Sequence, residues 1–471
     1  MQDKGAILVF LPGWDTISAI HYNLTSETLN DYRDNPNYEE DLTVFCLHSQ
    51  VDMNKQVKVF RPAEPGKRKV ILSTNIAETS VTIEDVCYVI DCGKINVLRY
   101  FPLQKASNLN MEWISKSNGQ QRAGRAGRVQ EGICWHLYSR LREESLKKYM
   151  DPDIKRQQLE EVVLNIKSLQ INIPKVEDFL TLLVEPPFRT YVQDAVDLLE
   201  QIGGLTPKDQ SLTPLGTNLA LIPLHPQLGK MVLMGVFFRC LDPILSIVSV
   251  LNEKDPFVLK KHNKKHELDS IRAKFANGEP SDHLMFVNVI HQWEEAFESG
   301  TSQQFCRKNY LNEKVLDGIY KIKQQVKERL DKMGILGNPT DLEQNSTNFR
   351  LIKAILAYAF YPLVKPRGID SKSRFTFLNE GNGKRIYINQ KSVNAGKMLV
   401  EPWITYFVAR GNKKGNLNAH DSTALDEKLF NAFKFSDLKN DVDQYVNGCL
   451  TKSLKPSAKQ SAVIKVITRI Q

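Results

Sequence analysis

The chain has 471 residues, of which 42% are hydrophobic and 25% are charged. These values are typical of a globular protein with about three or four domains and argue against an unfolded chain. Lysine and arginine outnumber aspartate and glutamate by 63 to 54, a net charge of +9 that favours a polyanionic partner, although ordinary solubility would also explain it. The seven cysteines include no Cys-x-x-Cys pair, which predicts reduced thiols, no metal site and an intracellular protein, in the cytoplasm, the nucleus or both.

Residues 1 to about 150 alternate apolar runs with polar helical stretches, which is the rhythm of a parallel sheet in one α/β lobe. The runs predicted as strands are Ala6–Leu11, Leu42–Leu47, Lys69–Leu72, Val86–Ile90 and Gly132–Leu137. Five Ser/Thr residues and one Asn follow the third strand within residues 73–85. Open α/β sheets place ligands at the carboxyl ends of their strands, so these short polar side chains predict a binding site. Helix capping would explain only one or two of them.

Residues 121–128 read Gln-Arg-Ala-Gly-Arg-Ala-Gly-Arg and form the most informative segment of the chain. Arg122, Arg125 and Arg128 are three residues apart, so we expect them to share one face of a helical turn that the intervening glycines leave open. Three cations without neutralising partners predict a bound anion, and a guanidinium aimed at a terminal phosphate can act as an arginine finger. A solvated basic turn is the alternative, but it needs neither the leading glutamine nor the two glycines.

From Ile154 onward the apolar periodicity becomes helical. The first positions that recur every three or four residues are Leu159, Val162, Val163, Ile166 and Leu169. The apolar stretch Met231–Leu251 is interrupted by charged residues and a proline, so we predict core helices there and no membrane span.

A charged, Asn-rich break at 338–348 precedes a change to short apolar runs separated by Gly and Asn turns. The runs are Phe375–Leu378, Arg385–Ile388 and Trp403–Ala409. Short strands with such turns predict a small barrel. Further strands would be expected after Arg410, but residues 411–415 read Gly-Asn-Lys-Lys-Gly, and the sequence from about residue 436 is predicted to be helix and tail.

Three ordered segments resemble motifs of the DEAH-box (DExH) superfamily 2 RNA helicases. Ile7–Trp14 resembles motif IV, Ser73–Asp85 resembles motif V and Gln121–Arg128 resembles motif VI. The stretch that follows Leu8, Val-Phe-Leu-Pro-Gly-Trp-Asp, is most similar to the RNA helicase A-like and G-quadruplex-resolving branch. The resemblance covers roughly residues 1–410 and implies an ATP-dependent RNA helicase, with DNA and G-quadruplexes open as further substrates.

The resemblance also implies a multidomain α/β architecture. Its parts are a second RecA-like domain over 1–150, a winged-helix domain over 151–225, a helical ratchet (HA2-like) domain over 226–340, an OB-fold over 341–435 that meets RNA and activating proteins, and a tail over 436–471. The family's Arg-Thr-Pro-Leu-Glu-Glu sequence at the winged helix is Arg-Gln-Gln-Leu-Glu-Glu in this chain, so the proline that fixes the turn is missing.

Two parts of the sequence each have two possible roles. The family places a β-hairpin that enters the duplex junction at residues 93–115, although Tyr100 and Phe101 could equally pin a packed loop to the domain. His283, in the ratchet-like part, could contact RNA, but a buried core histidine is the favoured interpretation.

In the family, two RecA-like lobes clamp ATP with Mg²⁺, and the resemblance assigns catalytic roles to Arg128, Arg125 and Gln121. The arginines would contact the γ-phosphate and the glutamine would order the attacking water or the phosphate. The residues matched to nucleotide contacts are Phe60, Ser80, Thr82 and Glu84. Phe60 matches the ring that stacks on adenine, although a core phenylalanine is an equal alternative. The family more often has Asp at the position of Glu84, which puts a ribose contact there in doubt.

The residues matched to RNA contacts are Gly13, Ser49, Thr74 and Asn75. Thr74 matches the family threonine that holds an RNA phosphate, and phosphate contacts carry no base preference.

The chain contains no Gly-x-x-x-x-Gly-Lys-Ser/Thr loop and no Asp-Glu-x-His. In the family these motifs, with the magnesium ligands, belong to the first RecA-like domain. We therefore expect a fragment or a short product that does not hydrolyse ATP alone. A helicase-derived RNA-binding or regulatory module is the alternative from another functional class, and the intact motifs V and VI favour the helicase.

Overall fold

The computed structural model describes residues 5–25, 41–48, 51, 56–62, 66–79, 82–101, 106–128, 131–169, 175–258, 265–336, 341–360, 364–369, 375–379, 385–397, 399, 403–411, 417–429 and 437–451. The chain divides into two compact units. Unit 1 comprises Met1–Arg99 and Leu109–Arg156, and unit 2 comprises Tyr100–Asn108 and Gln157–Gln471.

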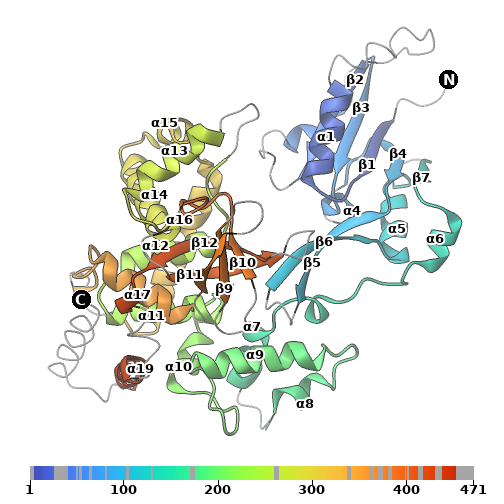
Figure 1. Ribbon diagram of the computed structural model, residues 1–471. Helices are drawn as coiled ribbons and strands as arrows, with labels where there is room; N and C mark the ends of the chain where they lie inside the picture. Colours follow the sequence, from blue (N-terminus) through green and yellow to red (C-terminus); the bar gives the residue numbers. More distant parts are fainter. Residues whose placement is uncertain are drawn as a thin grey trace. The chain divides into compact units, whose positions relative to one another are not determined.

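Unit 1 is built on a parallel sheet of five strands in the order β2-β3-β1-β4-β7 (Figure 1). The strands are β1 (Ala6–Phe10), β2 (Asp41–Leu47), β3 (Lys67–Ser73), β4 (Val86–Asp91) and β7 (Ile133–His136). All five were predicted from their apolar runs, and the parallel α/β lobe is confirmed. The sheet has a core on each face, because Leu8 and Ile71 belong to one buried cluster and Val70 and Leu72 to another.

Helices of unit 1 cover the sheet and connect its strands. They are α1 (Trp14–Thr25), the 3-10 helix η2 (Val57–Phe60), α4 (Ile76–Thr79), α5 (Lys116–Ala123), α6 (Arg140–Ser145) and the 3-10 helix η4 (Asp153–Lys155). Helix α1 packs on one face of the sheet through the buried side chain of Ile17, whereas Val59 of η2 and Ala77 of α4 belong to the core on the other face. Helix α4 follows the end of β3, which places the first part of motif V at the carboxyl edge of the sheet.

The segment 93–115 forms two strands, β5 (Lys94–Phe101) and β6 (Ala106–Trp113), paired in a sheet of their own. A hairpin is therefore present. The alternative, in which an aromatic side chain packs this segment against the rest of the protein, also holds for Tyr100. Tyr100, which belongs to unit 2, is 3% exposed, meets the ring of Tyr191 edge-on at 5.3 Å and donates a hydrogen bond to Asp194 at 3.1 Å.

Unit 2 begins with four helices and one short antiparallel bridge. The helices are α7 (Glu160–Ser168), α8 (Val176–Leu180), α9 (Arg189–Gln201) and α10 (Pro214–Leu219), and the bridge joins Leu205 to Leu212. The predicted amphipathic helix after Ile154 corresponds to α7, whose Val163 and Leu164 are buried. The winged-helix assignment of this region stays a prediction.

The central part of unit 2 is helical, as predicted. It contains α11 (Pro226–Phe237), α12 (Leu241–Asn252), α13 (Lys265–Ala276), α14 (Asp282–Glu298), α15 (Ser302–Lys308) and α16 (Glu313–Lys332). The stretch Met231–Leu251 falls on α11 and α12, which are interrupted at Arg239, where φ is +58°. In the part of the chain that the structure describes, no helix is long and apolar enough to cross a membrane.

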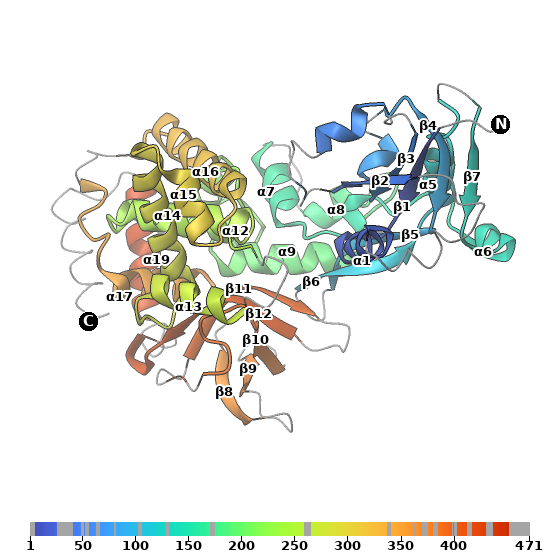
Figure 2. The same cartoon turned by 90° about the horizontal axis from the view of Figure 1, so that it is seen from above.

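A closed barrel of five strands follows α17 (Phe349–Ala359), as Figure 2 shows in orange and red. The strands are β8 (Val364–Ile369), β9 (Phe375–Asn379), β10 (Arg385–Ile388), β11 (Trp403–Gly411) and β12 (Leu417–Leu425), in the order β10-β12-β11-β8-β9. The strand expected after Arg410 was not located in the sequence; it is β12, which pairs with β11. The predicted late helix is α19 (Asp437–Leu450), and the OB-fold assignment stays a prediction.

A buried polar cluster joins the barrel to the helices of unit 2. Asp282, at the start of α14, is 1% exposed and accepts hydrogen bonds from the backbone N–H of Val393 and of Ser422, both at 2.8 Å, and from the Ser392 hydroxyl at 2.5 Å. We call Asp282, Ser392 and Ser422 the aspartate cluster. His283 is fully buried beside it, its Nδ1 lies 2.7 Å from the Thr423 hydroxyl, and burial lowers its pKa to about 3. The core interpretation of His283 is therefore confirmed.

Candidate nucleotide and nucleic-acid site

Residues matched to RNA contacts lie at the carboxyl edge of the unit 1 sheet. Gly13 follows β1, while Thr74 and Asn75 follow β3, and these two strands are parallel neighbours, so both strand ends reach the same edge. Thr74 is half-buried and Asn75 is exposed. A Cβ on Gly13 would lie 2.4 Å from Nδ2 of Asn96, so the absent side chain leaves room for that amide. Ser49 lies outside the described residues.

Residues matched to nucleotide contacts lie before the amino ends of three strands, β3, β4 and β7. Phe60 lies in η2 before β3, Thr82 and Glu84 precede β4, and Arg128 precedes β7. Parallel strands bring these starts to the edge opposite that of Gly13 and Thr74. Phe60 is 46% exposed, so the alternative of a core phenylalanine is wrong. Thr82 and Glu84 are also exposed, and Ser80 lies outside the described residues.

The three residues assigned to catalysis differ in their surroundings. Gln121 is exposed on α5, and Arg128 is exposed and donates a hydrogen bond to the Thr82 hydroxyl. Arg125 is 7% exposed, lies in the turn after α5 and donates to the backbone carbonyl of Glu78. Burial, and then the nearby charge of Arg128, lower the pKa of Arg125. A Cβ on Gly127 would meet no atom within 4 Å, so open space lies beside Arg128.

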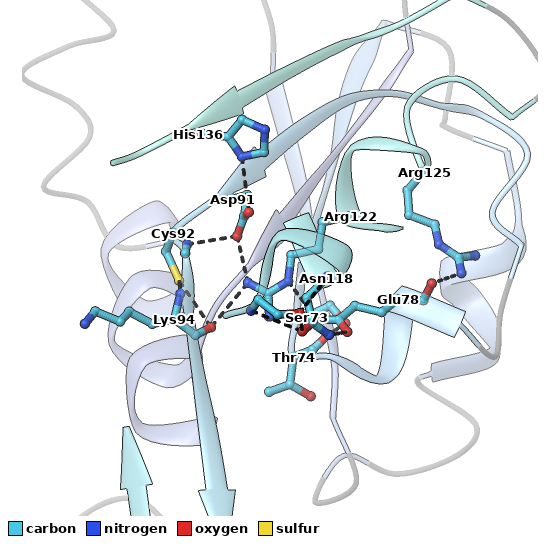
Figure 3. Close-up of polar contacts among 12 residues, drawn as sticks. Ser73, Thr74, Glu78, Asp91, Cys92, Lys94, Asn118, Arg122, Arg125 and His136 are labelled. Carbon is cyan, nitrogen blue, oxygen red and sulfur yellow. Dashed lines mark hydrogen bonds and ion pairs between the residues drawn. The ribbon is translucent and has the colours of Figure 1, made fainter. Parts of the chain in front are cut away.

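Arg122 contradicts the expected arrangement of the octet. Helix α5 ends at Ala123, so the three arginines do not share one helical face. Arg122 is 0% exposed, and its guanidinium donates to carboxylates of Glu78 and Asp91, each at 2.7 Å (Figure 3). Burial opposes its charge, but the ion pairs with Asp91 and Glu78 outweigh burial and raise its pKa. Arg122 is therefore a neutralised internal cation and not an anion ligand.

Further contacts make this a cluster of four residues. Asn118 donates to the second carboxylate oxygen of Glu78 at 2.9 Å, and Arg122 also donates to the Lys94 carbonyl at 3.2 Å. The guanidinium carbon of Arg122 lies 4.9 Å from the centre of the Phe10 ring. We call Glu78, Asp91, Asn118 and Arg122 the arginine cluster. The cluster connects motif V, which contains Glu78, to motif VI, which contains Arg122.

The start of α5 fixes the position of Asn118. The Ser115 hydroxyl accepts from the backbone N–H of Asn118 at 3.2 Å, and the Asn118 side chain accepts from the backbone N–H of Ser115 at 3.3 Å. This reciprocal cap satisfies two of the N–H groups that a helix start leaves open. Motif VI therefore begins on a helix whose first turn is held by its own side chains.

No group of three or more metal-ligating side chains suited to a metal ion occurs among the described residues. Two guanidinium groups follow α5, that of Arg128 exposed and that of Arg125 only 7% exposed. Guanidinium groups match phosphate oxygens, whereas Mg²⁺ prefers carboxylate and other oxygen ligands.

Comparison with known proteins decides the family. The family described as the helicase conserved C-terminal domain matches residues 1–130, and the helicase associated domain (HA2), ratchet-like, matches residues 225–286. The chain is 39% identical over 402 residues to ATP-dependent DNA/RNA helicase DHX36 of Homo sapiens, covering 83% of this chain and 39% of that protein. The chain carries a DEAH-box helicase C-terminal region.

Plant relatives support the same conclusion. DExH-box ATP-dependent RNA helicase DExH6 of Arabidopsis thaliana is 36% identical over 398 residues, covering 83% of this chain and 30% of that protein. DExH3 of the same plant is 34% identical over 436 residues, covering 92% and 35%. The chain thus spans about two fifths or less of the length of these DEAH-box relatives.

Sequence reasoning found the exposed residues of this DEAH-box lobe and missed the buried ones. Glu78 and Asp91 were not predicted as partners of Arg122, although Glu78 lies inside motif V. The available signal was the carboxylate itself, because a charged residue between apolar runs is buried only when it is paired.

Proposed function

We propose that this chain is the part of an ATP-dependent RNA helicase that supplies the second wall of the ATP cleft. Arg125 and Arg128 contact the γ-phosphate of ATP bound with Mg²⁺, and Gln121 orders the attacking water. The observation that carries the proposal is the exposed guanidinium of Arg128 beside Thr82 of motif V, in a turn with open space at Gly127.

The matched first wall is a RecA-like domain with a phosphate loop and an Asp-Glu-x-His motif. Charge on the transferring phosphoryl group develops in the transition state, and a guanidinium placed across the cleft stabilises that charge. RNA is proposed to bind along Gly13, Thr74 and Asn75 at the carboxyl edge of the sheet, with the barrel as a second contact surface and as the site for activating proteins. DNA and RNA G-quadruplexes are the next substrates to test, and a cytoplasmic or nuclear location is proposed with them.

The test joins this chain to, or mixes it with, a first RecA-like domain of the family. RNA-stimulated ATP hydrolysis should appear in the combination and be absent from the chain alone, because the arginines provide charge without a phosphate loop. Arg128→Ala should lower turnover by about 10³ or more while RNA affinity stays nearly unchanged, and Arg128→Lys should not restore it. Arg140→Ala, which removes another exposed arginine of the same lobe, is the control and should leave turnover unchanged.

The outcomes separate the helicase from the alternative. Equal loss of RNA binding and of turnover in Arg128→Ala would identify residues 121–128 as a nucleic-acid patch. RNA binding by a combination that never hydrolyses ATP would favour the helicase-derived RNA-binding module.

RNA binding by the chain itself has its own test. With a net charge of +9 and phosphate contacts at Thr74, affinity for single-stranded RNA should fall steeply with rising salt and depend little on base sequence. Thr74→Ala should weaken RNA stimulation more than basal hydrolysis. An affinity that stays flat from low to high salt would contradict the polyanion interpretation.

A further inference from the structure

The base of the β5–β6 hairpin is held by the same carboxylate that holds motif VI. Asp91 ends β4 and is 0% exposed. One of its oxygens accepts from Arg122 at 2.7 Å and from the backbone N–H of Gly93 at 2.9 Å, and Gly93 is the residue before β5. The other oxygen lies 3.2 Å from Nδ1 of His136 and accepts from the Tyr138 hydroxyl at 3.4 Å.

The end of β6 lies beside the start of β5. The backbone N–H of Ile114, directly after β6, donates to the Gly93 carbonyl at 3.1 Å. Trp113 at the end of β6 meets the Tyr138 ring edge-on at 6.2 Å, and the Lys94 ammonium lies 3.3 Å from the centre of the Trp113 ring. Helix α5, in which motif VI begins, starts at Lys116, three residues after the end of β6.

Close packing leaves little freedom between these parts. A Cβ on Gly93 would lie 2.5 Å from Cδ1 of Tyr138, and φ of Gly93 is +71°, a conformation that side chains rarely adopt. Burial, and then the charge of Asp91, raise the pKa of the Tyr138 hydroxyl, so it remains a hydrogen-bond donor to the carboxylate. Figure 3 shows Asp91 between His136 and Arg122. The Arg122 guanidinium also donates to Glu78, which accepts a second hydrogen bond from Asn118.

We propose that Asp91, Arg122 and Tyr138 are positioning residues that make motif VI and the base of the hairpin move as one body, so that a shift of the phosphate-contacting turn is transmitted to the hairpin. Arg122 is 0% exposed and acts through its partners Glu78 and Asp91. The inference rests on the proposed function, because the transmitted shift is the one that hydrolysis causes. Ion pairs inside a protein with two discrete arrangements can carry coupling of this kind between sites.

Two mild substitutions interrupt this connection at different points. Glu78→Gln keeps the length of the side chain and an oxygen for Arg122 but removes one of its two carboxylate partners. Tyr138→Phe keeps the ring against Gly93 and Trp113 but removes the hydroxyl that contacts Asp91 and His136. The matched control is Glu294→Gln in unit 2, which removes one of the two carboxylates around another buried cation, Lys323.

The first measurement counts RNA strand separation per ATP hydrolysed, with the chain joined to a first RecA-like domain and a duplex that carries a single-stranded tail. Glu78→Gln should lower this ratio about tenfold and Tyr138→Phe by a smaller factor, while Glu294→Gln leaves it unchanged. If hydrolysis and strand separation fall by the same factor, Arg122 supports the fold alone and the inference is wrong. Loss of hydrolysis in the unmodified combination would instead overturn the proposed function.

The second measurement needs no hydrolysis and uses the chain by itself. Hydrogen exchange should accelerate in Glu78→Gln both in the peptide that contains α5 and at the base of the hairpin, around Gly93 and Ile114, while β2 and β3 stay protected. Acceleration confined to α4 and α5 would show that the hairpin base does not depend on the arginine cluster and would overturn the inference.

Discussion

The arginine cluster of unit 1 and the aspartate cluster of unit 2 both hold buried carboxylates, but different groups bind those carboxylates. Each joins segments that are distant in sequence through a buried carboxylate. In unit 1 the carboxylates of Glu78 and Asp91 are neutralised by Arg122, whereas Asp282 in unit 2 is held mainly by backbone N–H groups and a hydroxyl. The first cluster therefore depends on charge and the second on the position of the backbone.

Their surroundings differ as well. The arginine cluster lies next to the turn that carries Arg125 and Arg128, so a change in it reaches the candidate nucleotide site. The aspartate cluster lies between α14 and the barrel, and its neighbour His283 is fully buried. Of these two clusters, the arginine cluster is the one that adjoins residues proposed to contact nucleotide.

The largest effect is expected from removing the cation of the arginine cluster. Arg122→Ala leaves the carboxylates of Glu78 and Asp91 buried without their partner, which should destabilise unit 1 by about 3–5 kcal/mol. Lys147→Ala, which removes a 69% exposed lysine paired with Asp151, should change stability by less than about 0.5 kcal/mol. Urea unfolding followed by hydrogen exchange in β1 and β4 measures the difference. Similar losses in the two variants would contradict the ion-pair account of this cluster.

A second effect concerns a buried glutamate whose pKa is raised. Glu160 in unit 2 is 3% exposed, and burial, with the charges of Asp194 and Glu161, raises its pKa to about 7. Because its folded pKa exceeds the ordinary value of 4.5, the stability it contributes is present at low pH and is lost as pH rises from about 4.5 to about 7.

Glu160→Gln should therefore stabilise unit 2 by up to about 3 kcal/mol at pH 8 and by little at pH 4.5. Melting temperatures of the two proteins across that range test this. An advantage of the variant that is largest at low pH would contradict the sign of the shift.

The smallest effects on stability are expected at two glycines, one in each unit. A Cβ on Gly132 would lie 2.3 Å from the carbonyl oxygens of Ala126 and Cys87, and one on Gly216 would lie 2.0 Å from the Gly204 carbonyl oxygen. Both alanine variants should lose about 1–3 kcal/mol of stability, because backbone must move. Only Gly132→Ala displaces the turn of motif VI, so only it should lower ATP turnover beyond its loss of folded protein in the combined enzyme. Equal specific activity in both variants would show that this turn tolerates displacement.

The sequence alone was sufficient for the elements with strong local patterns. Apolar runs at Ala6–Leu11 and Val86–Ile90 predicted β1 and β4, because the strands of a buried parallel sheet are apolar on both faces. Motifs IV, V and VI were sufficient to recognise the DEAH-box family, since each keeps several residue types at fixed spacing. Strand β12 was missed because its residues, Leu417–Leu425, mix polar and apolar side chains, and the pairing with β11 decides their conformation.

Only the tertiary structure decided what each arginine of residues 121–128 does. Their spacing is uniform in the sequence, yet α5 ends at Ala123, so Arg122 turns inward to Glu78 and Asp91 while Arg128 stays exposed beside Thr82. The carboxylates that select Arg122 lie 44 and 31 residues away along the chain. Local spacing sets which side chains share a helical face, but burial and charge pairing depend on segments that only the folded sheet brings together.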